Sequence, residues 1–221
     1  MKLYSIMLIV ILAACNGHKS ESTNTSADSA TANMASDERQ RDMVSSSQSS
    51  ETAVQQMHNA MTAMMNDMQT METSGDPDQD FAMLMRRHHQ AAIDMARVEI
   101  VNGKDEKLKA MAQKMIDDQQ KEVTEFFNFL KGHQLKGNSN YADTAIALMS
   151  HMDTPMSNTS SIDQMFATMM VPHHIDGIEM AQAFLKVGKN SNMKGIANKI
   201  VQSQQKEVDE LNAWLNSNKQ S

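Results

Sequence analysis

Two copies of one short motif carry the residues best suited to chemistry. Met85 stands three positions before the pair His88-His89, and Met170 stands in the same place before His173-His174. Side chains three or four residues apart share one face of an α-helix, so each methionine lies on the same face as its histidines. Imidazole is the commonest metal ligand, and a thioether sulfur favours soft ions such as Cu(I). Six side chains are therefore candidate ligands of a copper ion: Met85, His88, His89, Met170, His173 and His174.

The motifs belong to an internal repeat. A shift of about 85 residues aligns 81–130 with 166–215 without a gap, and the five residues from Gln119 to Val123 then match those from Gln204 to Val208. Each copy predicts one helix with the His-His pair, followed by a second helix. The four predicted helices extend over about 78–102, 105–131, 161–187 and 191–216. Long antiparallel helices joined by short loops indicate an all-α, up-and-down four-helix bundle.

Capping residues and glycines set the predicted ends of these helices. Asp76 and Pro77 offer an N-cap followed by proline in the first turn, and Gly103 and Gly132 are good C-terminal stops. Pro172 falls inside the helix over about 161–187. It lacks a backbone N–H, so it is expected to kink that helix or to mark a local restart.

Two further helices are predicted to cover the bundle. The first extends over about 50–72 and the second over about 141–153, so that the repeats occupy about 51–132 and 138–217. The first carries methionines at spacings of three and four: Met57, Met61, Met64, Met68 and Met71. Methionine fills irregular cores well, so packing is the favoured role of this stripe.

A glutamine and a glutamate are predicted to be the polar partners of each histidine pair. On the second helix of each repeat, Gln119 and Gln204 lie in the middle of the apolar face, with Glu122 and Glu207 beside them. A buried amide without a partner costs about 1–3 kcal/mol, so a polar partner is expected inside the bundle. The inward histidines are the obvious partners, and these four residues are predicted to orient them.

Other residues near the motifs take different places. Asp94 and Glu179 fall on the helix face opposite to the histidines and are predicted to point at solvent. Ala92 and Gly177, one turn beyond the first histidine of each pair, are small enough to leave room beside the imidazoles or to let a neighbouring helix approach closely. Three histidines have no counterpart in the other repeat and are each predicted to be a solvated helix or loop residue: His58, His133 and His151. Four side chains are candidates for accessory metal sites: Met95, Met180, His58 and His151.

The first fifteen residues predict a secreted lipoprotein. Lys2 precedes the apolar run 3–12, which is too short to span a bilayer, and Leu12-Ala13-Ala14-Cys15 resembles the lipobox of bacterial lipoproteins. The resemblance implies a signal peptide over 1–14 and lipidation of Cys15. A flexible Ser/Thr-rich tether is expected to extend to about residue 50, because it holds too few apolar residues to offset its ordering entropy. In the lipoproteins that this segment resembles, a residue other than aspartate after the cysteine permits sorting to the outer membrane, so Asn16 and the resemblance together imply a position at the outer membrane, facing the periplasm.

The motif residues also resemble a known family. Phe81, Met85, His88-His89, Ile93 and Met95-Ala96, with their equivalents in the second copy, resemble the bacterial secreted family catalogued as domain of unknown function 305. The resemblance implies a ferritin-like bundle of two two-helix repeats. Some members of that family are periplasmic copper-binding proteins, so it also implies copper handling as a role.

Three functions stay open at this point. The first is a non-enzymatic envelope protein that sequesters or transfers copper. The second is a ferritin-like di-metal oxidase or peroxidase, for which inward carboxylates are few: Glu99, Glu122 and Glu207. The third is a structural or partner-binding protein whose histidines only lock the bundle. The net charge of −7 disfavours nucleic acid as a partner, whereas a metal-exchanging protein or a second copy of the chain remains open.

Overall fold

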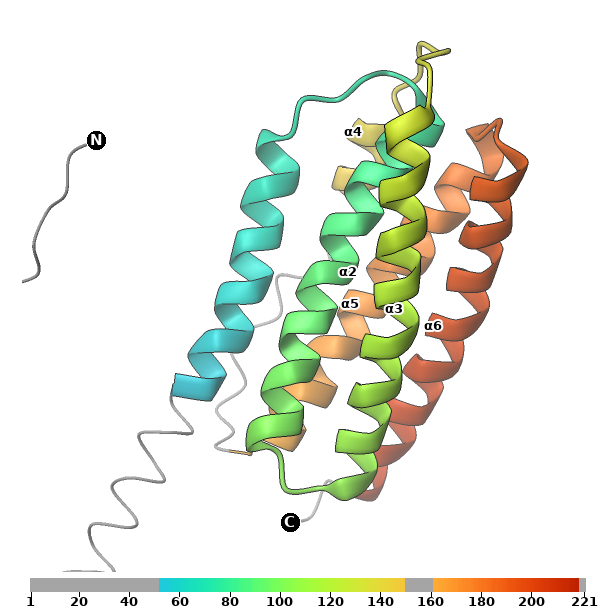
Figure 1. Ribbon diagram of the computed structural model, residues 1–221. Helices are drawn as coiled ribbons and strands as arrows, with labels where there is room; N and C mark the ends of the chain where they lie inside the picture. Colours follow the sequence, from blue (N-terminus) through green and yellow to red (C-terminus); the bar gives the residue numbers. More distant parts are fainter. Residues whose placement is uncertain (1–51, 150–160, 219–221) are drawn as a thin grey trace, which may run out of the picture. The chain divides into compact units, whose positions relative to one another are not determined.

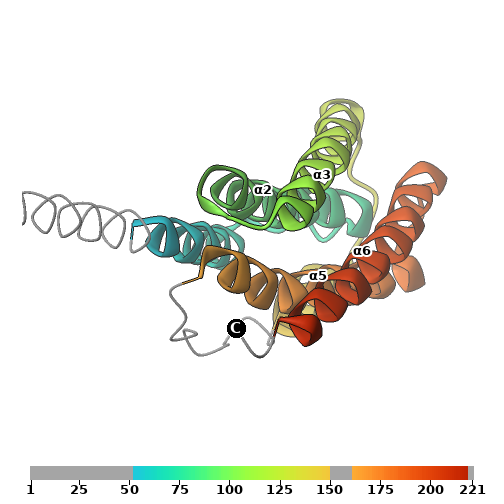
Figure 2. The ribbon, with the colours of Figure 1, turned by 90° about the horizontal axis from the view of Figure 1, so that it is seen from below.

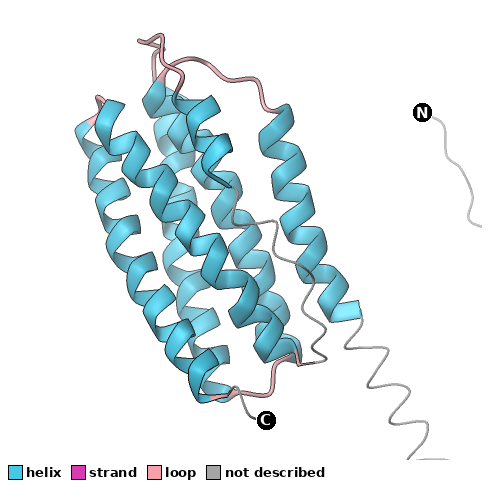
Figure 3. Ribbon diagram, turned by 180° about the vertical axis from the view of Figure 1, so that it is seen from behind, coloured by secondary structure: helices cyan, strands magenta, loops and turns pink. Residues whose placement is uncertain are grey.

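The computed structural model describes residues 52–149 and 161–218, which all lie in one compact unit, Met43–Ser221. Helices extend over 52–70, α2 (Pro77–Asn102), α3 (Glu106–Gly132), α4 (Tyr141–Leu148), α5 (Ile162–Val187) and α6 (Ser191–Ser217) (Figure 1). These residues contain helices and loops and no strand, which confirms the predicted all-α class (Figure 3). The predicted signal peptide, Cys15, the tether and His151 lie outside the described residues.

The four long helices form two hairpins that face each other. α2 packs on α3, α5 packs on α6, and α2 meets α5 between the hairpins (Figure 2). Phe81 stacks on Phe184, and the ring of His88 lies against that of His173, so α2 and α5 run antiparallel. This is the bundle of two two-helix repeats that the repeated sequence predicts. None of the described helices is long and apolar enough to cross a membrane.

The helix ends follow from local capping, with two departures from expectation. The Asp76 carboxylate accepts hydrogen bonds from the amides of Asp78 and Gln79, as predicted for the N-cap of α2. Gly132 is still helical, and His133 is the C-cap of α3. α5 continues through Pro172 as one helix, so of the two predicted effects the local restart is wrong, and the kink stays a prediction. Proline removes one hydrogen bond from the ladder, and the buried face of α5 on both sides of it holds the helix together.

Two apolar clusters fill the core on either side of the histidines. The first surrounds Phe81, which stacks on Phe184 with ring centroids 4.1 Å apart and meets Phe126 edge to face at 5.6 Å. The second contains Phe166 and Trp214 with several methionines. The histidine pairs lie in the middle of α2 and α5, between the parts of these helices that build the two clusters. They therefore form a polar layer inside an apolar bundle.

The helix over 52–70 covers α2 and α5 with its methionines. Met64 and Met68 are buried in the cluster around Phe81, and Met57 is buried in the cluster around Phe166. Met61 and Met71 are partly buried at the edges of the same clusters. The stripe therefore packs as predicted.

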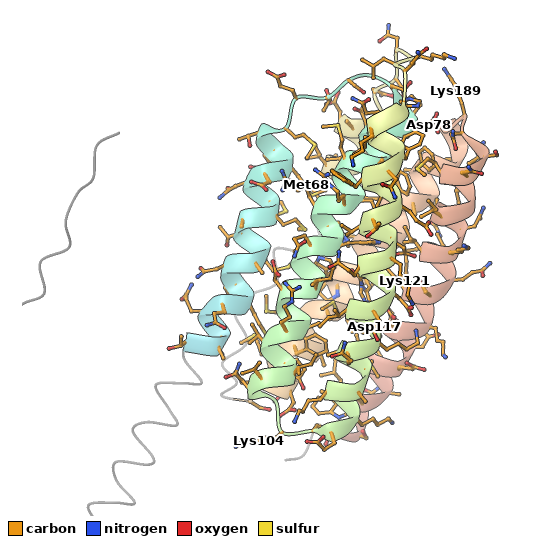
Figure 4. The ribbon with its side chains drawn as sticks, in the orientation of Figure 1. Met68, Asp78, Lys104, Asp117, Lys121 and Lys189 are labelled. Atoms are coloured by element: carbon orange, nitrogen blue, oxygen red, sulfur yellow. The ribbon has the colours of Figure 1, made fainter. Side chains whose placement is uncertain are left out.

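Two equivalent aspartates tie each repeat to the other. The Asp78 carboxylate accepts hydrogen bonds from the amides of Lys189, at 3.0 Å, and Asn190, at 2.9 Å. Its counterpart Asp163 accepts from the amides of Lys104, at 2.8 Å, and Asp105, at 2.7 Å. Figure 4 shows Asp78 and Lys189 at one end of the bundle and Lys104 at the other. We call these contacts the Asp78 clamp and the Asp163 clamp; neither is among the contacts predicted from the sequence.

Candidate metal centre

The four paired histidines are wholly buried where α2 meets α5. His88, His89, His173 and His174 each have 0% of their surface exposed. The rings of His88 and His173 lie with their centroids 3.7 Å apart and their planes at 36°. Nε2 of His88 donates a hydrogen bond to the carbonyl oxygen of His173, at 2.9 Å. The two repeats therefore meet through equivalent imidazoles.

The outer histidine of each pair lies against a glutamate from the next helix. Nε2 of His89 is 2.7 Å from Oε2 of Glu122 on α3. Nε2 of His174 is 3.0 Å from Oε2 of Glu207 on α6, although out of line for a good hydrogen bond. The predicted proximity of these glutamates to the histidines is confirmed. A carboxylate on Nε2 fixes the tautomer with the proton there and leaves the lone pair on Nδ1.

The two glutamines complete the polar layer from the outer helices. Gln119 and Gln204 are both buried. A Cβ atom on Gly177 would collide with Oε1 of Gln204 and would lie 2.8 Å from Cε1 of His88. Because glycine has no side chain, Gln204 of α6 can lie close to α5 at position 177 and reach the side of the His88 imidazole. This confirms that a small residue makes room there.

Many polar atoms of this layer have no well-aligned hydrogen bond to any described residue. They are Nδ1 of all four histidines, Nε2 of His173 and His174, and the amide oxygen and nitrogen of Gln119 and Gln204. Buried polar groups are almost always satisfied by protein, water or a bound ion, and each unsatisfied one costs about 1–3 kcal/mol. The layer therefore needs additional partners.

Burial keeps the central imidazoles neutral. It lowers the pKa of His88 and of His173 well below the ordinary value, and the charge that neighbouring histidines would carry lowers both further. The hydrogen bond from His88 to the His173 carbonyl opposes this shift only in part. Neutral imidazole is the form that binds metal ions, because the lone pair of one ring nitrogen is free.

The methionines of the motifs are buried next to the histidines along the chain. Met85 belongs to the cluster around Phe81, and Met170 to the cluster around Phe166. Met95 and Met180 are also fully buried in these clusters. Within 52–149 and 161–218, no three His, Cys, Asp or Glu side chains converge closely enough to hold a metal ion.

The other predicted positions agree only in part. Asp94 and Glu179, both predicted to point at solvent, are each half-buried, and the Asp94 side chain is 45% exposed. His58 on the helix over 52–70 is half-buried, and its Nε2 has no hydrogen bond among the described residues. The prediction that His133 is solvated is wrong. Its Nε2 lies 3.0 Å from Oδ1 of Asp76, and its ring packs on Phe129, because the end of α3 folds back onto the start of α2.

The chain is similar to solved structures of one protein, CopM. CopM in the Ag-bound form is 25% identical, with a TM-score of 0.51, and the match covers 63% of this chain and 95% of that one. CopM in the apo form and in the Cu(I)-bound form are each 24% identical, with TM-scores of 0.50 over 63% of this chain and 96% of theirs. No curated protein matches the chain.

A family model matches nearly the whole sequence. It covers residues 14–130 and 133–220, and thus both repeats with their histidine motifs. The chain belongs to the family described as Domain of unknown function (DUF305).

Proposed function

We propose that this protein binds copper in its central histidine layer and sequesters or transfers the ion without catalysing a reaction. The ligands would be drawn from both repeats: Met85, His88, His89, Met170, His173 and His174. The observation that carries the proposal is a set of four buried imidazoles whose Nδ1 atoms have no hydrogen-bond partner among the described residues, with the pKa of the central two, His88 and His173, lowered by burial. A bound ion would satisfy these nitrogens.

The residues around the histidines favour a soft ion. A histidine that binds a metal usually donates its other N–H to a carboxylate, which is the relation between His89 and Glu122. The nearby sulfurs belong to methionines, and thioethers select Cu(I) over hard ions. The related protein CopM has been solved in an Ag-bound form, and Ag(I) is a soft ion of the same charge as Cu(I).

A di-metal oxidase is the weaker candidate. Ferritin-like di-iron sites use several carboxylates together with histidines. Glu99 lies at the end of the bundle where α2 turns into α3, and Glu122 and Glu207 lie against histidines. The described residues contain no cluster of three His, Asp or Glu ligands, which such a centre requires.

A purely structural role has one observation in its favour. The hydrogen bond from His88 to the His173 carbonyl joins α2 to α5 without any metal. If the histidines served only to join the helices, replacing His88 and His173 by glutamine would lower the melting temperature. Copper would then leave the melting temperature of the wild-type protein unchanged. A rise on adding Cu(I) supports metal binding, because a ligand that binds only the folded state stabilises it.

Titration with Cu(I) against a chromophoric chelator tests the proposal. The wild-type protein should compete for the ion, and a variant with glutamine at all four paired histidines should not. A double variant with the milder changes Glu122→Gln and Glu207→Gln should bind Cu(I) about 10–100-fold more weakly, because these carboxylates orient the ligands.

Two variants serve as controls in this titration. Glu125→Gln changes an exposed carboxylate on α3, and His133→Ala removes a histidine at the end of the bundle. Both should bind as the wild-type protein does, and circular dichroism should show every variant to be helical. Equal affinity in the wild-type and four-histidine variants would exclude the site.

We also propose that the protein is a lipoprotein held by Cys15 at the outer membrane, facing the periplasm. The support is the lipobox-like sequence Leu12-Ala13-Ala14-Cys15 behind a short apolar run. Metabolic labelling with a fatty acid should mark the wild-type protein and not Cys15→Ser. In fractionated cells the Cys15→Ser protein should no longer follow the outer membrane. Labelling of both proteins would contradict the assignment.

A further inference from the structure

A carboxyl group is enclosed at the end of the bundle where α2 turns into α3. Glu99 has no exposed surface, and neither of its oxygens has a hydrogen-bond donor among the described residues. A Cβ atom on Gly103 would collide with Oε1 of Glu99, so the carboxyl group lies directly beneath the turn. The histidine layer makes no use of this group.

The charged groups around Glu99 are mostly acidic. Its carboxyl group interacts with that of Asp163 from α5 and with the charge of Asp105 from the turn. The cation Lys109 of α3 acts in the opposite direction. A contact between two carboxyl groups is a hydrogen bond only if one of them carries a proton. Two ionised carboxylates in this place would repel each other.

Asp163 is the group that holds the turn. In the Asp163 clamp its Oδ1 accepts hydrogen bonds from the amides of Lys104 and Asp105. An ionised carboxylate is the stronger acceptor of such bonds. All of these hydrogen bonds can therefore form when Asp163 is ionised and Glu99 is protonated, so that Glu99 donates a hydrogen bond to Asp163.

The other end of the bundle has the same clamp without the acid. The Asp78 clamp binds the amides of Lys189 and Asn190, and the position equivalent to Glu99 is Phe184. Phe184 packs beneath Gly188 as Glu99 packs beneath Gly103. The two clamps therefore differ in the side chain that packs beneath the turn, which is the carboxyl group of Glu99 for the Asp163 clamp and the ring of Phe184 for the Asp78 clamp.

We propose that Glu99 makes the Asp163 clamp a proton-controlled latch, which is closed while Glu99 is protonated and opens the α2–α3 turn as the proton leaves. The Asp78 clamp, backed by Phe184, stays closed over the same pH range. The latch does not depend on copper binding and can be tested on the metal-free protein.

The electrostatics of the site agree with this geometry. Burial raises the pKa of Glu99 from 4.5 to about 8, the charge of Asp163 and the hydrogen bond to it add to the rise, and Lys109 opposes it. When the turn opens, Glu99 regains water and an ordinary pKa. Between pH 4.5 and 8 the closed state therefore holds a proton that the open state has lost, so opening becomes more favourable as the pH rises. Above pH 8 the effect levels off.

Hydrogen exchange of single amides, corrected for intrinsic rates, tests the latch in the protein with a chelator present. Protection of the Lys104 and Asp105 amides should fall about tenfold for each pH unit between 5 and 8, since one proton is released on opening. Protection of the Lys189 and Asn190 amides should change much less. Equal pH dependence at the two turns would overturn the proposal.

The variant Glu99→Gln separates the proton from the shape of the side chain. It should keep the Lys104 and Asp105 amides protected and remove their extra dependence on pH. Glu106→Gln, which changes an exposed carboxylate in the first turn of α3, should behave as the wild-type protein does. An unchanged pH dependence in Glu99→Gln would refute the latch.

A direct titration covers the case in which Glu99→Gln does not fold. The carbon-13 shift of the Glu99 carboxyl group in the wild-type protein should titrate with a midpoint near 8. A midpoint near the ordinary value of 4.5 would show that the group is ionised at neutral pH, and the proposal would be wrong.

Discussion

Acidifying the metal-free protein from pH 7 to pH 5 should lower its free energy of unfolding, because His88 and His173 must stay neutral when folded. Burial and neighbouring histidines depress the pKa of both, so below pH 6.5 the unfolded chain takes up protons that the folded chain does not. Each pH unit below about 6.5 then costs at most about 1.4 kcal/mol for each histidine, or about 2.8 kcal/mol for the pair.

Glu99 works against this loss in the same pH range. Its pKa is raised when folded, so it stabilises the folded state increasingly as the pH falls from 8 to 4.5. This contribution amounts to about 1.4 kcal/mol per pH unit with the opposite sign. The slope of the two histidines should therefore stand out most clearly in a Glu99→Gln background.

Urea unfolding at stepped pH values, with a chelator present, measures these slopes. In the Glu99→Gln background the free energy of unfolding should fall steeply below pH 6.5. Adding His88→Gln and His173→Gln should remove most of that fall, because glutamine does not titrate. If the slope stays the same after both replacements, the central histidines are not the groups that resist protonation.

Replacing Phe126 by alanine should cost about 3–5 kcal/mol of stability, because the ring is wholly buried and leaves a cavity. Phe126 meets Phe81 edge to face at 5.6 Å and lies 5.9 Å from the ring of His89. Its loss removes the packing between α3 and α2 next to the histidine layer. Equilibrium urea denaturation of the metal-free protein gives the change directly.

The next residue in the chain is the matched control. Phe127 is 45% exposed, and its ring only supports the Lys131 ammonium, 4.1 Å above the ring centre. Phe127→Ala should therefore change the stability by no more than about 1 kcal/mol. Similar losses in the two variants would mean that α3 is not oriented as described.

Several parts of the site were predictable because they depend on the spacing of residues along one helix. The 3.6-residue period places His88 and His89 on the inward face of α2 and Asp94 on the outer face, whatever the neighbouring helices are. The repeat then requires the same of α5. Capping by Asp76 is likewise local, since the side chain binds amides two and three residues ahead.

The partners of these inward groups depend on how the helices pack against each other, and the spacing of residues within one helix does not predict that packing. The Asp78 and Asp163 clamps were missed because each carboxylate binds amides of the other repeat, 111 and 59 residues away in the case of Lys189 and Lys104. His133 was misplaced because Asp76, which is distant in sequence, meets it at the end of the bundle.

For the paired histidines, the sequence determined the inward direction, and the tertiary structure determined the partners. Their spacing in the chain determined that both pairs face the core and share that face with a methionine. Only the tertiary structure decided that the ring of His88 lies against that of His173 while His89 and His174 turn to Glu122 and Glu207. The physical reason is that side-chain packing along both helices sets their separation and relative rotation, and a small rotation changes which of two adjacent inward side chains reaches the opposite helix.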